Sequence, residues 1–138
     1  MDIYRYILVG MVLTECAWFD IKTRAVPGHA IIAAIITIYA SLLIWGKTDD
    51  IIPSVIGLAA LVIPSVIYSR SFNMGEGDIL MLAMVGATIG INHVMVFLVT
   101  ADICMLLFLL YTRKDADEMP MAPFFLIGYI AAVLSLVF

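Results

Sequence analysis

A chain of 138 residues in which 64% are hydrophobic and 13% charged is far from a soluble domain, which averages roughly 45–50% apolar and about 25% charged residues. Together with a mean hydropathy of +1.14, this composition predicts an all-α integral membrane protein, and the length leaves room for one membrane domain spanning residues 1–138 without a sizeable soluble one. The net charge of −4 argues against nucleic acid as a partner and leaves the lipid bilayer as the expected surroundings.

Six apolar segments are expected to form a bundle of six transmembrane helices. The first lacks a strongly basic start and a small-x-small cleavage site, so it is expected to be a mature helix and not a signal peptide. At about 1.5 Å of rise per residue, all but the fourth approach the roughly 30 Å of hydrocarbon that a helix must cross. The segments are Ile3–Phe19, His29–Trp45, Ile51–Tyr68, Ile79–Ile91, Val94–Tyr111 and Ala122–Phe138.

The fourth segment is short, about 20 Å by the same arithmetic, and a re-entrant half-helix is the alternative to a crossing. Loop charges favour the crossing, because a re-entrant segment would erase the asymmetry between the two sides. Six crossings give one side Lys22, Arg24, Arg70, Arg113 and Lys114, and give the other side Arg5 and Lys47. The positive-inside rule then places both termini outside and three loops in the cytoplasm, namely Asp20–Gly28, Ser69–Asp78 and Thr112–Met119. Gly46–Asp50 and Asn92–His93 become tight outer turns.

Small and special residues add expectations about packing. Gly86 and Gly90 form a small-xxx-small pair that would let another helix approach the fourth segment closely. Pro64 permits a bend in the third segment. Cys16 and Cys104 lie inside apolar segments and outside any CxxC, which favours buried thiols over a disulfide or a zinc site. His29 and His93 begin helices, where capping is favoured over metal binding, so no metal site is predicted.

Two aspartates stand where apolar segments meet loops on the same predicted side. Asp20 follows the first segment and could be a solvated boundary charge that pairs with Arg24 four residues on. Asp78 ends the run Gly75-Glu76-Gly77-Asp78, and it could simply cap the helix that follows. The competing hypothesis is that the glycines remove side chains so that a peptide can approach Asp78.

Peptide-bond hydrolysis would require two carboxyl groups on the same side of the membrane. Amide hydrolysis without a metal or covalent nucleophile requires a base to activate water and an acid to protonate the carbonyl oxygen or the leaving nitrogen. Two nearby carboxyl groups in a poorly solvated site resist double ionisation, share one proton and supply both functions. Asp20 and Asp78 are therefore candidate catalytic residues whose titration would belong to the pair.

These motifs resemble those of the type IV prepilin peptidases, whose relatives include archaeal preflagellin peptidases and the short enzymes of tight-adherence pilus systems. That family carries an aspartate followed seven residues later by proline, similar to the run Asp20–Pro27, and a second aspartate that ends a GxGD, similar to Gly75–Asp78. A Gly-containing helix follows the GxGD, as does a proline-bearing start to the last helix, here Pro120–Phe124. Gly28 replaces the family's usual asparagine, and Leu80 stands where many members have lysine.

The resemblance implies an aspartic endopeptidase that cuts short basic leader peptides from pilin-like precursors at the cytoplasmic face of the cell membrane. It implies Asp20 and Asp78 as catalytic residues, with Gly75, Gly77, Pro27 and Pro123 shaping the substrate site, and no cofactor. The family's methyltransferase region with its paired CxxC motifs is missing, so the peptidase-only form is expected. Signal-peptide-peptidase and presenilin proteases share GxGD, but they are much longer and carry their first aspartate differently.

Two other classes of function stay open at this level. A noncatalytic pilus-assembly scaffold would tolerate loss of either aspartate. A small proton-coupled carrier would depend on the intramembrane carboxyl groups of Asp102 and Glu15, whose structural alternatives are a bond to a partner helix or a place beside Asp20. The acidic group Asp115, Asp117 and Glu118 would attract a basic leader, or consists of ordinary loop charges. The precursor, the cleavage position and the oligomeric state are not predicted.

Overall fold

The computed structural model describes residues 3–72, 75–112 and 119–137, and these residues form helices joined by short loops, with no strand among them. Each helix matches an apolar segment of the sequence, except that α4 contains both the fourth and the fifth predicted segments. The elements are α1 (Ile3–Thr23), α2 (Gly28–Ile44), the 3₁₀ turn η1 (Thr48–Asp50), α3 (Ile51–Phe72), α4 (Glu76–Thr112) and α5 (Ala122–Val137).

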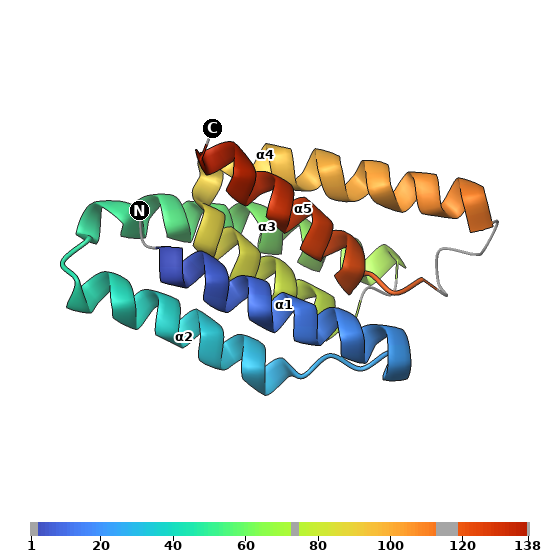
Figure 1. Cartoon of the computed structure of the whole chain (residues 1–138), viewed down its shortest axis with the longest axis horizontal. Coiled ribbons are helices and arrows are strands. Elements are labelled where there is room, and N and C mark those ends of the chain that lie inside the picture. Colours follow the sequence, from blue (N-terminus) through green and yellow to red (C-terminus); the bar gives the residue numbers. More distant parts are fainter. Residues whose placement is uncertain (1–2, 73–74, 113–118, 138) are drawn as a thin grey trace.

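Helix α4 reverses direction at Gly90, so its two halves occupy the places of the predicted fourth and fifth segments (Figure 1). Gly90 has φ 65° and ψ 176°, a backbone conformation that is essentially restricted to glycine because a Cβ atom would clash. The predicted outer turn at Asn92–His93 is therefore displaced by two residues. The backbone requirement at Gly90 explains the displacement.

The reversal gives the chain two distinct ends. The start of α1, the α2–α3 connection, the reversal within α4 and the end of α5 lie at one end, while the C-terminal ends of α1, α3 and α4 lie at the other (Figure 1). We call the first the far end and the second the site end, since Asp20 and Asp78 both lie there. The C-terminal ends of α1, α3 and α4, which precede the three loops predicted to be cytoplasmic, therefore lie at the same end of the bundle.

A close helix crossing joins α3 to the first half of α4. A Cβ atom built on Gly57 would lie 2.5 Å from the Gly86 carbonyl oxygen, and one on Gly86 would lie 2.5 Å from the Gly57 carbonyl oxygen. The Ser54 hydroxyl donates a hydrogen bond of 2.5 Å to the Ala87 carbonyl across the same contact. The small-xxx-small prediction for Gly86 is thus confirmed, with Gly57 of α3 as the residue that packs against it.

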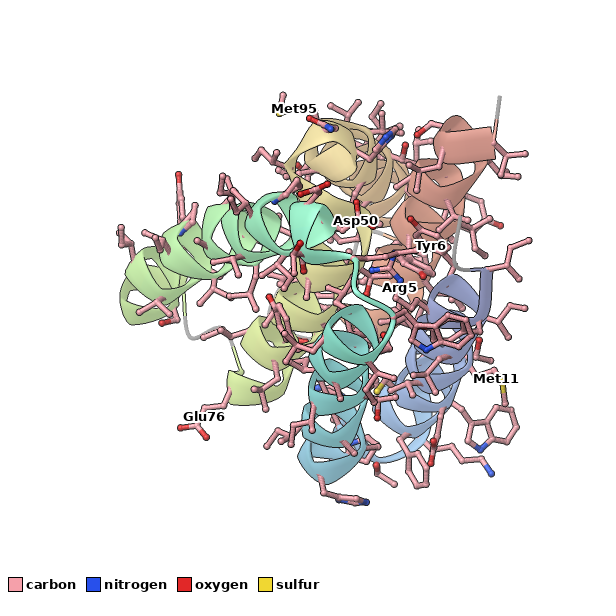
Figure 2. All side chains as sticks on the ribbon, turned by 90° about the vertical axis from the view of Figure 1, so that its left-hand side faces the viewer. Arg5, Tyr6, Met11, Asp50, Glu76 and Met95 are labelled. Carbon is pink, nitrogen blue, oxygen red and sulfur yellow. The ribbon has the colours of Figure 1, made fainter. Side chains whose placement is uncertain are left out.

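The first half of α4 is the centre of the bundle, because every residue from Met81 to Gly90 is buried. The other helices each contribute one buried face, such as Val9, Leu13 and Cys16 on α1. By contrast, large apolar side chains on the outside are strongly exposed, including Ile44 at 80% and Leu110 at 69%. Figure 2 shows Met11 and Met95 projecting away from the bundle in the same way. Such a surface suits hydrocarbon and not water.

Length and composition alone identify two helical stretches able to cross a membrane, Thr48–Ser69 and Glu76–Thr112, among the residues described. Gly28–Ile44 and Ala122–Val137 are shorter apolar helices, and α1 carries Arg5, Glu15, Asp20 and Lys22. The all-helical fold is confirmed, whereas six membrane crossings stay a prediction.

Candidate active site

Asp20 lies in the last turn of α1, which ends at Thr23. The sequence had predicted that Asp20 would be the first residue of the loop after this helix. Its side chain points to the bundle interior and is only 8% exposed. The Ala122 backbone amide, at the first residue of α5, donates a hydrogen bond of 3.0 Å to the Asp20 Oδ2 atom. A solvated boundary charge would have neither the burial nor this partner, so the simplest interpretation of Asp20 does not describe the structure.

Arg24, the expected ion-pair partner of Asp20, does not continue the helix. Its φ of 53° is left-handed, its side chain is exposed, and its backbone amide donates a hydrogen bond of 3.1 Å to the Asp20 carbonyl oxygen. The helix therefore ends between the two residues, which removes the i, i+4 geometry that the predicted pair requires.

Asp78 is the third residue of α4 and lies just ahead of the apolar run that begins at Ile79. Its backbone amide donates to the Gly75 carbonyl, and the Gly75 amide in turn hydrogen-bonds the Asp78 carboxyl group. An acidic side chain in the first turn that reaches back to the preceding amide is half of a capping box. Asp78 therefore differs from the predicted cap, because it lies inside the first turn of α4 and bonds the amide before the helix instead of the amides that follow it.

The pKa of Asp78 is raised from 3.8 to about 6. Burial of the carboxyl group is the largest cause, the negative charge of Asp20 is the second, and the hydrogen bond from Gly75 opposes both by lowering the pKa. The influence of Asp20 shows that the structure brings the two aspartates within electrostatic reach. Neither belongs to an ion pair among the residues described, and no direct hydrogen bond joins their carboxyl groups there.

The segment between α1 and α2 packs against the start of α4 and so sets the position of Asp20 relative to Asp78. A Cβ atom on Gly77 would lie 2.9 Å from the Val26 Cβ atom, and one on Gly28 would lie 3.5 Å from Leu80. The chain just after Asp20 therefore packs directly on the first turn of α4, beside Asp78. These contacts fix the positions of the two helix ends relative to one another.

The residues predicted to shape the substrate site all lie at the site end, although their roles differ. Val26 lies in the space beside Gly77, so a side chain at this position would collide with the protein itself. Gly75 precedes α4, and a Cβ atom there would meet the Asp78 Oδ2 atom at an ordinary 3.5 Å. Pro27 precedes α2 and its carbonyl accepts the amides of the first turn, while Pro123 is the second residue of α5.

The other carboxyl groups considered in the sequence are not brought to this site. Glu15 on α1 and Asp102 on α4 are both exposed. Among the residues described, no group of three or more His, Cys, Asp or Glu side chains could hold a metal ion. Cys16 is a buried free thiol and Cys104 a partly buried one. The acidic group Asp115, Asp117 and Glu118 lies outside the described residues.

The hydrogen bond from the start of α5 to Asp20 was not predicted from the sequence, although Pro123 in the same turn was expected to shape the substrate site. A backbone amide leaves no trace in residue identity, and the only signal was the pair of prolines in Pro120-Met121-Ala122-Pro123, which marks the start of a helix. That α5 would start against Asp20 depends on the tertiary packing of α1 on α5. The same packing includes a hydrogen bond of 3.0 Å from the Tyr129 hydroxyl to the Tyr6 carbonyl.

Comparison with known proteins gives one finding. The family model for the type IV leader peptidase family matches residues 7–110, a range that includes both aspartates and the whole of α2 and α3. The searches of curated proteins and of solved structures found no match.

Proposed function

Because the chain belongs to the type IV leader peptidase family, we propose that it is a membrane aspartic endopeptidase with Asp20 and Asp78 as its catalytic residues. Its substrates are the precursors of type IV pilin-like proteins, of the Flp pilin or archaellin type, from which it removes the short basic leader. The observation that carries the proposal is the placement of two carboxyl groups, one buried and one half-buried, close enough for the charge of Asp20 to raise the pKa of Asp78.

The proposed chemistry needs only what these two side chains supply. One carboxylate accepts a proton from water as the water attacks the scissile carbonyl, and the other carboxyl group donates its proton to the carbonyl oxygen. A pKa near 6 for Asp78 means that a protonated carboxyl group is available at mildly acidic to neutral pH, which an ordinary aspartate would not offer. No cofactor is required.

The proposed orientation has the site end in the cytoplasm and both termini outside. Support comes from the positive charges, because Lys22 and Arg24 lie at the site end next to Asp20, while Arg5 and Lys47 lie at the far end. Arg5 is buried there and forms a salt bridge of 3.5 Å with Asp50, which Figure 2 shows beside it. A precursor whose apolar helix is in the bilayer would then present its cytoplasmic leader at the level of the aspartates.

The test is co-expression with a pilin-like precursor, followed by separation of precursor and mature forms by size. Asp20→Asn and Asp78→Asn should each reduce cleavage by at least about 10³-fold, since either change removes the shared proton or the base. Asp102→Asn is the matched control, because it makes the same chemical change at an exposed position of α4. It should cleave like the wild type.

The alternatives predict other patterns in the same experiment. A noncatalytic assembly scaffold would leave precursor processing, by whatever enzyme performs it, unchanged in both site variants. A proton-coupled carrier would make Asp102→Asn the damaging substitution. Folding of each variant is checked by detergent-solubilised yield and thermal unfolding, so that loss of cleavage is assigned to chemistry only where the protein is intact.

A further inference from the structure

A cleft opens between the C-terminal half of α3 and the second half of α4. It encloses about 260 Å³, and its lining is almost entirely apolar. Leu61, Leu82 and Phe125 are buried at its floor, while Ala60 of α3 and Leu98 of α4 are half-buried in its two walls. Figure 2 shows the C-terminal end of α3, in pale green, standing apart from the second half of α4.

The cleft lies one helical turn from the residues that form the candidate active site. Leu82 is four residues after Asp78 on α4, so the two side chains share one side of the helix and are about 5.4 Å apart along its axis. Phe125 is three residues after Ala122, whose amide donates to the Asp20 carboxyl group. Because the first half of α4 and α5 both run from the site end to the far end, the cleft lies on the membrane side of the aspartates.

The polar groups of the cleft suit a peptide better than a lipid chain. The Ser65 hydroxyl donates to the Leu61 carbonyl at 2.6 Å, so its hydrogen is already used within α3. Pro64 lies inside α3 and has no amide hydrogen, and the Ala60 carbonyl therefore lacks the donor that a helix normally supplies one turn later. A peptide amide is a suitable donor to this oxygen, whereas an acyl chain has none.

The volume of the cleft fits one large apolar side chain. An apolar cavity of about 150 Å³ is enough to hold a benzene ring, so this cleft has room for a leucine or phenylalanine side chain and part of the adjoining main chain. Successive Cα atoms of a peptide are about 3.8 Å apart. A side chain that lies one helical turn from Asp78 therefore belongs to a residue next to the scissile bond or one position further on.

We propose that this cleft binds the first large apolar side chain of the precursor after the scissile bond, and that Ala60 limits the size of the side chain accepted. The inference rests on the proposed function and adds the residues that select its substrate. It agrees with the proposed orientation, because the basic leader stays at the site end while the apolar helix that begins with this side chain extends into the bilayer. Ala60 is then a specificity-determining residue and not a catalytic one.

A larger groove of about 1280 Å³ runs along α1 and α5, but it is placed differently. It extends from Ile3 and Val137 to Trp18 and Leu126. The lining residues that the structure describes all belong to α1 and α5, whereas Asp78 lies on α4. The α3–α4 cleft is therefore the better candidate for the residue next to the scissile bond.

The test exchanges size between the protein and the precursor. Two purified precursors differ only in the first apolar residue after the scissile bond, one having leucine and the other alanine, and kcat/KM is measured for each in detergent micelles. Ala60→Leu puts a larger side chain into the cleft, so the ratio of kcat/KM for the leucine precursor to that for the alanine precursor should fall about tenfold. Ala59→Leu is the matched control, because it makes the same change at the neighbouring half-buried residue of α3, outside the cleft lining. It should keep the wild-type ratio.

Thermal unfolding in detergent shows which variants are intact, and Ala60→Val makes a smaller change of the same kind should Ala60→Leu not fold. A wild-type ratio in the Ala60 variants would overturn the proposal, and so would an equal fall in Ala59→Leu. A ratio that changes in Gly10→Leu and not in Ala60→Leu would also overturn it, since Gly10 lines the α1–α5 groove. Failure of the proposed function would show differently, as cleavage that survives in Asp20→Asn or Asp78→Asn.

Discussion

Buried ionisable groups have different kinds of partner at the two ends of the bundle. At the far end, the buried guanidinium group of Arg5 has a carboxylate partner in Asp50 at 3.5 Å, so charge is matched by charge. At the site end, Asp20 and Asp78 lie within electrostatic reach of each other, belong to no ion pair among the residues described, and accept hydrogen bonds from the backbone amides of Ala122 and Gly75. The first arrangement compensates a buried charge, whereas the second costs stability, because burial and the neighbouring charge of Asp20 raise the pKa of Asp78.

The backbones differ between the ends as well. Near the far end, α3 and α4 meet through the main chains at Gly57 and Gly86, a contact that permits almost no adjustment. At the site end, side-chain and amide contacts join α1, α4 and α5. We interpret the far half as the rigid support and the site end as the part whose geometry sets the rate of the reaction, and the predictions below test this division.

The largest effect on stability is expected at the α3–α4 crossing. Gly86→Ala would place a Cβ atom 2.5 Å from the Gly57 carbonyl oxygen, so the helices must separate, and we expect a loss of about 3 kcal/mol in the free energy of unfolding. Gly10→Ala is the control on α1, because its nearest neighbour is Tyr129 at 3.8 Å, and it should change stability by less than about 0.5 kcal/mol. Unfolding in detergent monitored by circular dichroism measures both. Equal stability of the two variants would contradict the rigid crossing.

The pH dependence of stability should arise at the site end. Since the pKa of Asp78 is raised from 3.8 to about 6 in the fold, its contribution is fully present below pH 3.8 and is lost as the pH rises through about 6. At 1.36 kcal/mol per pKa unit and with a discount for partial exposure, stability should fall by about 2 kcal/mol over this window.

Two variants test whether this pH dependence of the free energy of unfolding arises at the site end. Asp78→Asn should abolish most of it, because an amide does not titrate. Asp50→Asn, the same change at the far end, should keep it, and should lower stability by no more than about 1 kcal/mol because Asp50 is half exposed. A slope that survives in Asp78→Asn would place its origin elsewhere.

How far the sequence predicts this molecule follows from what each feature depends on. Composition and segment lengths predict the helices, and loop position predicts that Asp20 and Asp78 share an end, because membrane helices alternate in direction. Gly86 could be predicted as a contact residue, since small residues at helical spacing serve little else in an apolar helix. Its partner Gly57 could not, because glycine alone does not specify which helix approaches.

The remaining site features depend on tertiary contacts that residue types do not encode. Gly77 and Asp78 suggest an open approach for substrate, yet Val26 fills the space beside Gly77 because the α1–α2 segment folds over α4. The Ala122 amide has no side-chain signature at all. Likewise, the turn at Gly90 differs from the predicted Asn92–His93 because the polar residues mark the region of a turn, while the backbone geometry requires the glycine.

The smallest effect, and the sharpest test of the division between the two ends, concerns Gly77. Gly77→Ala would place a Cβ atom 2.9 Å from the Val26 Cβ atom, so the α1–α2 segment must move by a few tenths of an ångström away from Asp78. Stability should change by less than at Gly86, because Val26 is only half-buried and lies in a loop, whereas the rate of precursor cleavage should fall about tenfold, since small displacements of catalytic groups are costly. Val26→Ala in the same chain removes the colliding atoms and should restore most of the rate. A rate that falls equally with and without the Val26 change would show that the alanine obstructs substrate directly, and Gly77 would then be the open approach that its motif suggests.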